Sequence, residues 1–136
     1  MSHEPLLTGL ALAAVTCLAS VRFPPRRSLE FFAAVLAATS SVYLGAALAD
    51  GRTSLIFLES VAYLPVFALA LAGLWRSSPA FLAAGYVAHG AWDFFHHPLR
   101  LGASGGERFP DLCVAYDVVV GLFILYQARA ARSAAS

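Results

Sequence analysis

Five long apolar runs limit the fold of this chain more than any other feature. Each is close to the roughly 20 residues that an α-helix needs to cross a bilayer. They cover, in approximate numbers, residues 6–23, 28–49, 53–75, 79–97 and 110–127. Hydrophobic residues make up 60% of the 136 residues and charged residues only 12%, whereas soluble domains average about 25% charged. We therefore predict an all-α, polytopic membrane bundle of about five transmembrane helices, forming a single domain over residues 1–136.

Local signals at the ends of the runs predict where the helices begin and stop. Only Met-Ser-His-Glu-Pro precedes the first run, so we expect a retained helix and not a cleaved leader. Ser28 is the expected N-cap of the second helix, with Glu30 in its first turn, where the helix dipole favours an acid. In the fourth run, Pro79 suits the first helical position, and Pro98 should end the helix at His97 or one residue earlier.

Arginine distribution predicts the orientation in the membrane. With the N-terminus outside, the inner ends carry Arg22, Arg26, Arg27, Arg76, Arg129 and Arg132, and the outer ends carry Arg52, Arg100 and Arg108. Because arginine is enriched on the cytoplasmic side, this bias predicts an N-out/C-in topology. The net charge of only +1 argues against a nucleic-acid partner. Membrane lipids are the expected surroundings, and so small a bundle is expected to form a homo-oligomer or join a larger membrane complex.

The strongest functional signal is the stretch YVAHGAWDFFHH at residues 86–97, which places ionisable groups inside an apolar helix. Such groups are expensive in a membrane and are functional by default. At about 100° per residue, Asp93 lies about +40° and His96 about −20° from His89, whereas His97 lies at about +80°. His89, Asp93 and His96 therefore share one stripe, and His97 is expected to support a ligand or to lie in the following loop.

Two further acids fall at the same depth. At about 1.5 Å per residue, Glu59 lies about 9 Å and Asp117 about 10 Å from the outer ends of their helices. Asp93 and His89 lie about 6 and 12 Å below the outer end of the fourth helix. All three helix ends meet at the same face, so we expect Glu59, His89, Asp93, His96 and Asp117 to share one level in the outer third of the membrane.

This set of imidazoles and carboxylates predicts a cation site. The candidate metal-binding residues are His89, Asp93, His96, His97, Glu59 and Asp117, and the expected ion is divalent zinc, iron or manganese. Glu59 and Asp117 are further ligands or the general base, which makes them the candidate catalytic residues. The leading hypothesis is a metal-dependent membrane hydrolase or oxidoreductase with a lipid-like or amphiphilic substrate, and the glycine-rich segment Leu99–Phe109 is a candidate lid.

Two other functions fit the same residues. The polar cluster could serve helix packing in a small non-catalytic subunit or assembly factor of a larger membrane complex. It could also belong to a proton or ion pathway. A pathway needs polar groups across the membrane, and the inner half of the fourth helix, Phe81–Val87, has no ionisable residue. Conduction therefore ranks last.

The residues of the candidate site resemble those of a family of short bacterial integral-membrane proteins that is classed as a domain of unknown function. The resemblance rests on a middle-helix glutamate followed by an HxxWDxxHH stretch, represented here by Glu59 and by His89, Trp92, Asp93, His96 and His97. A later Cys-Asp step corresponds loosely to Cys113 and Asp117, which are separated in this chain. The resemblance supplies no activity. It implies that these residues act as one unit, and that the protein resides in a bacterial cytoplasmic (inner) membrane.

Overall fold

The protein is built from five α-helices. The computed structural model describes residues 3–99 and 109–133, with the side chains of 96–99 and 109 outside the described set. The helices are α1 (His3–Ser20), α2 (Pro25–Ala49), α3 (Thr53–Trp75), α4 (Pro79–Leu99) and α5 (Phe109–Ser133), and the described residues form no strand. Four of them, α1, α2, α3 and α5, are long and apolar enough to cross a membrane. The predicted all-α membrane bundle is confirmed: this is a helical membrane protein.

Two helix ends that involve prolines differ from the prediction. Helix α2 begins at Pro25, its N-cap is Pro24 with φ −62° and ψ 155°, and no side chain caps it. The prediction that Ser28 is the N-cap was therefore wrong. Proline suits the first turn because its fixed φ is already helical and its missing N–H would have no partner there. At its C-terminal end, α4 continues to Leu99, past the expected stop at His97. This is possible because a following proline disfavours helical geometry without forbidding it.

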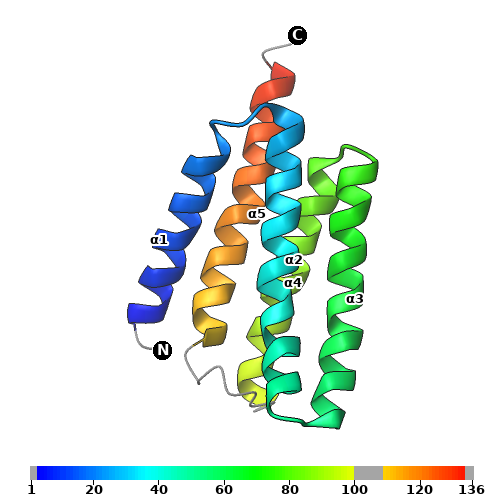
Figure 1. Ribbon diagram of the computed structural model, residues 1–136. Helices are drawn as coiled ribbons and strands as arrows, with labels where there is room; N and C mark the ends of the chain where they lie inside the picture. Colours follow the sequence, from blue (N-terminus) through cyan, green and yellow to red (C-terminus); the bar gives the residue numbers. More distant parts are fainter. Residues whose placement is uncertain (1–2, 100–108, 134–136) are drawn as a thin grey trace.

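The helices run alongside one another in one bundle (Figure 1). Helix α5 packs between α1 and α4, α3 contacts α4 on another side, and α2 contacts both α3 and α4. One end, which we call the N-terminal end, holds the start of α1, the α2–α3 turn, the end of α4 and the start of α5. The opposite end holds the α1–α2 and α3–α4 turns and the C-terminus. We call it the arginine end, after Arg22, Arg26, Arg27, Arg76, Arg129 and Arg132.

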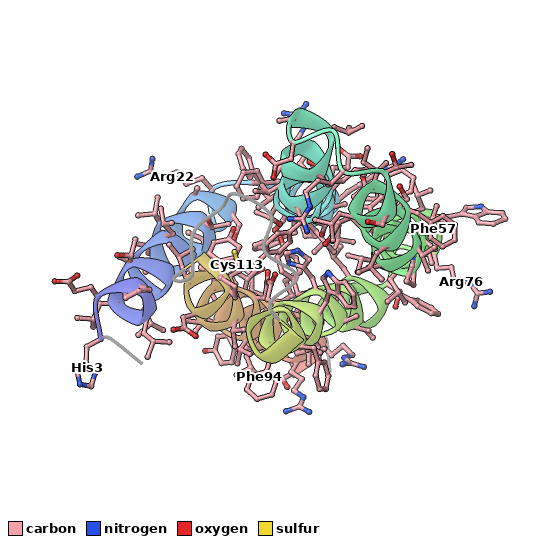
Figure 2. All side chains as sticks on the ribbon, turned by 90° about the horizontal axis from the view of Figure 1, so that it is seen from below. His3, Arg22, Phe57, Arg76, Phe94 and Cys113 are labelled. Carbon is pink, nitrogen blue, oxygen red and sulfur yellow. The ribbon has the colours of Figure 1, made fainter. Side chains whose placement is uncertain are left out.

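Helix α4 supplies much of the interior. Leu82 and Tyr86 are fully buried, as are Phe32 and Leu36 from α2. The Tyr86 hydroxyl donates a 2.8 Å hydrogen bond to the Phe32 carbonyl oxygen, which joins α4 to α2. The outer surface is apolar instead. Figure 2 shows Phe57 and Phe94 on the outside of the bundle, where they are 73% and 64% exposed, as expected of side chains that face lipid.

Candidate metal centre

Three ionisable side chains from α4 and α5 meet inside the N-terminal half of the bundle. His89 and Asp93 are one helical turn apart on α4, so both face the same neighbour. The Nδ1 atom of His89 lies 2.7 Å from Asp117 Oδ2 on α5 and 3.5 Å from Asp93 Oδ2. The shorter distance is a hydrogen bond between ring nitrogen and carboxylate. It joins the two helices through the site itself.

The three side chains are buried, and their hydrogen bonding is incomplete. His89 is only 2% exposed, and Asp93 and Asp117 are 0% exposed. Among the described residues, His89 Nε2, both carboxylate oxygens of Asp93 and Asp117 Oδ1 have no hydrogen-bond partner. Burying polar atoms without partners is costly, and native structures contain few of them. A bound cation would satisfy several of these lone pairs at once.

The geometry of the three side chains suits a metal ion. Each offers one ligand atom, and these atoms all lie within 4.8 Å of one another. One imidazole and two carboxylates match the ligand preferences of zinc, iron and manganese. The two cysteines, Cys17 and Cys113, are free and buried, and neither belongs to this group of potential ligands. His89, Asp93 and Asp117 could therefore hold a metal ion.

A glycine allows α4 and α5 to approach closely at this point. Gly90 follows His89 directly, and a Cβ atom placed on it would lie 3.2 Å from the Asp117 Cβ. A contact this short is tighter than most real Cβ contacts, so a larger residue would push the helices apart. The absence of a side chain at Gly90 thus sets the distance between Asp117 and the α4 stripe.

Glu59 enters from α3 and is held by a tryptophan. It is 3% exposed, and its Oε2 accepts a 3.2 Å hydrogen bond from Trp92 Nε1 on α4. Trp92 lies about 60° from His89 around the helix, on the opposite side to Asp93. The α4 stripe therefore contacts α5 on one side and α3 on the other. Glu59 does not belong to the group of three potential ligands.

Sequence reasoning missed two neighbours of the site. Trp92 was named only through the family resemblance, with no contact assigned to it, and Tyr43 was not considered. Tyr43 is 4% exposed on α2 and interacts electrostatically with Asp93 and Glu59. It lies about 9 Å from the end of α2 at Ala49, at the depth predicted for the acids. The same depth count, applied to every polar residue of α2, would have found it.

The remaining predicted residues cannot be placed in the site. His96 and His97 belong to the α4 helix, but their side chains lie outside the described residues. Most of the candidate lid, residues 100–108, lies outside them as well. The structure thus brings together His89, Asp93 and Asp117, with Glu59 beside them. The ligand and catalytic roles assigned to these residues stay predictions.

Comparison with known proteins identifies a family and no activity. Residues 4–130 match the family of unknown function DUF6010, and the chain belongs to that family. Comparisons with curated proteins and with solved structures found no match.

Proposed function

We propose that this member of a family of unknown function binds a divalent metal ion at His89, Asp93 and Asp117 and is a metal-dependent enzyme of the bacterial cytoplasmic membrane. The proposal rests on one observation: three potential ligand atoms from two helices lie within 4.8 Å of one another, at residues that are at most 2% exposed. Two buried carboxylates side by side cannot both stay ionised without a positive charge beside them. A bound divalent cation would supply that charge. Without a cation, only the proton in the His89–Asp117 hydrogen bond lies between the two groups.

The kind of ligand favours catalysis over a structural role. Structural zinc sites are built largely from cysteine thiolates, whereas catalytic sites often combine histidine and carboxylate ligands and keep a position open for water or substrate. The three potential ligands among the described residues are one histidine and two aspartates. A bound ion would supply Lewis acidity and an activated water. Glu59, which lies beside the three and is oriented by Trp92, is then the candidate general base.

The position of the site sets the expected substrate class. The three side chains are enclosed by helices whose outer faces are apolar, so a substrate that reaches them must partition into the membrane. We therefore propose a lipid-like or amphiphilic molecule. Its polar group would lie at the level of Glu59 and Asp117, in the membrane leaflet at the N-terminal end.

A variant of Glu59 separates catalysis from metal binding. Protein loaded with zinc, iron or manganese would be incubated with mixed micelles of phospholipids and acylglycerols, and the products followed by mass spectrometry. Glu59→Gln should keep the metal and lose turnover by about a hundredfold or more, whereas His89→Ala should lose both. Glu30→Gln, at the exposed start of α2, is the matched control. Full turnover in Glu59→Gln, or no metal-dependent product, would overturn the proposal.

One observation favours a second function, in which the cluster serves helix packing in a non-catalytic subunit. Three hydrogen bonds tie α4 to its neighbours: Tyr86 to α2, Trp92 to α3 and His89 to α5. If packing is the whole role, Asp93→Asn lowers the melting temperature equally with and without a chelator. If a metal is bound, the chelator alone reproduces most of that loss, because a ligand bound only to the folded state adds stability.

A further inference from the structure

A cavity of about 780 Å³ opens at the arginine end, away from the metal centre. It lies where the end of α1 meets the starts of α2 and α4 and the last turns of α5. Much of its wall is apolar and includes Val21, Phe23, Leu29, Phe32, Ile124 and Leu125. Its volume falls within the range of about 300–1,000 Å³ that is usual for small-molecule sites. None of the candidate metal-binding residues lines it.

The charged residues around this cavity are arginines. Arg26 and Arg132 both line it. Arg26 pairs with Glu30 at 3.3 Å, but its side chain is 89% exposed and can turn towards a ligand. The Nε of Arg132 donates to the Ala128 carbonyl oxygen at 3.2 Å, and Arg132 has no carboxylate partner among the described residues. An apolar wall with a cationic rim is complementary to an amphiphile with a negatively charged head.

The first turns of two helices and a serine hydroxyl add hydrogen-bond donors to the wall of this cavity. Helices α2 and α4 begin at Pro25 and Pro79, both in the cavity wall, and no side chain caps the first amides of α2. Helix N-termini favour anions through their free N–H groups and their dipole. Ser28, which is only 7% exposed, also lines the cavity, so its hydroxyl is a further donor available to a bound anion.

We propose that the cavity binds an anionic phospholipid of the surrounding leaflet. The acyl chain would occupy the apolar part, beside Phe32 and Ile124. The phosphate would meet Arg26, Arg132 and the Ser28 hydroxyl. The arginine bias that predicts this end to be cytoplasmic places the site where anionic headgroups attract basic residues. This proposal is independent of the metal centre and of the enzyme activity proposed above.

Native mass spectrometry of the detergent-solubilised full chain tests the proposal directly. The protein would be titrated with phosphatidylglycerol and with phosphatidylcholine carrying the same acyl chains. We expect a preference of about tenfold or more for phosphatidylglycerol, which corresponds to a charge-assisted hydrogen bond. Arg26→Gln and Arg132→Gln should each remove most of this preference. Ala131→Trp, which places a large side chain in the cavity, should weaken binding of both lipids.

Neighbouring arginines that do not line the cavity provide matched controls. Arg27→Gln and Arg129→Gln remove the same charge one residue from Arg26 and three residues from Arg132, and should change the affinity by less than about twofold. Circular dichroism confirms that each variant keeps its helices. Equal losses in the controls would show diffuse attraction and overturn the proposal. Equal binding of both lipids, displacement of the lipid by excess inorganic phosphate, or unchanged binding by Ala131→Trp would overturn it as well.

Discussion

The two halves of the bundle differ in whether they bury ionisable side chains. In the N-terminal half, His89, Asp93 and Asp117 point inward and are at most 2% exposed. At the arginine end the charges stand outside, as in the 89% exposed side chain of Arg26, and the hollow that they border is largely apolar. The same helices thus enclose polar groups at one level and surround an apolar space with charges at another.

This difference predicts which substitutions should lower the stability of the fold and which should change ligand binding. Removing one partner of a buried charge pair costs about 3–5 kcal/mol, because the other partner is left uncompensated. An exposed ion pair contributes only about 0.2–1 kcal/mol. Substitutions at the metal centre should therefore affect folding as well as function, whereas those around the cavity should affect ligand binding with little loss of stability.

The largest effect is expected from His89→Ala. It removes the hydrogen-bond partner of Asp117 and one of the three proposed ligands, so the two buried carboxylates lose the compensation they have in the wild type and the free energy of unfolding should fall by about 3–5 kcal/mol. Chemical unfolding in detergent, followed by circular dichroism, measures the change. His3→Ala, at the start of α1, is the control. A His89→Ala variant as stable as the control would show that the buried cluster contributes no more than the exposed end.

Gly90→Ala should be the next most damaging change. Its new Cβ would lie 3.2 Å from the Asp117 Cβ, and such overpacking costs about 1–3 kcal/mol. Gly45→Ala is a matched control on α2, because nothing lies within 4 Å of a Cβ placed there. That variant should gain about 0.5–1 kcal/mol, since glycine is unfavourable inside a helix. Unfolding changes of the same sign in both variants would contradict the close α4–α5 contact.

A smaller effect is expected from Trp92→Phe. It keeps an aromatic ring but removes the N–H that binds Glu59, and an interhelical hydrogen bond of this kind contributes about 1 kcal/mol. Trp75→Phe changes a residue that is 92% exposed and should leave the free energy of unfolding unaltered. If both variants lose the same stability, the Trp92–Glu59 bond has no role in holding α3 against α4.

The smallest effect is expected from Arg26→Gln. Its exposed pair with Glu30 should contribute less than about 0.5 kcal/mol, even though the variant is expected to lose the preference for phosphatidylglycerol. The same unfolding experiment measures the stability, and native mass spectrometry measures the lipid. A loss of stability as large as that of His89→Ala would contradict the contrast between the two ends.

Much of the fold could be predicted from composition and helix geometry. The apolar runs predicted all five helices, and the period of α4 correctly placed His89 and Asp93 on one face. Depth counting predicted that Asp117 and Glu59 would lie near them, and the His89–Asp117 and Trp92–Glu59 hydrogen bonds show this proximity. Both arguments succeed because a helix has fixed rise and rotation.

Other features depend on tertiary contacts that no single helix encodes. Trp92 lies off the stripe, and only the position of α3 makes it the partner of Glu59. The cavity at the arginine end forms where four helix ends converge, so its residues are scattered through the chain and share no spacing. The start of α2 was misjudged because the preference for serine as an N-cap was weighed above the fit of Pro25 to a first turn.

Metal content is the most direct test of the central claim. Protein purified without chelator would be measured by inductively coupled plasma mass spectrometry, with Asp93→Asn and Arg26→Gln in parallel. Asparagine keeps the size of Asp93 but is a far weaker ligand. We expect one divalent ion per chain in the wild type and in Arg26→Gln, and its loss in Asp93→Asn. A folded wild type that neither contains nor takes up zinc, iron or manganese would contradict it, as would full occupancy in Asp93→Asn.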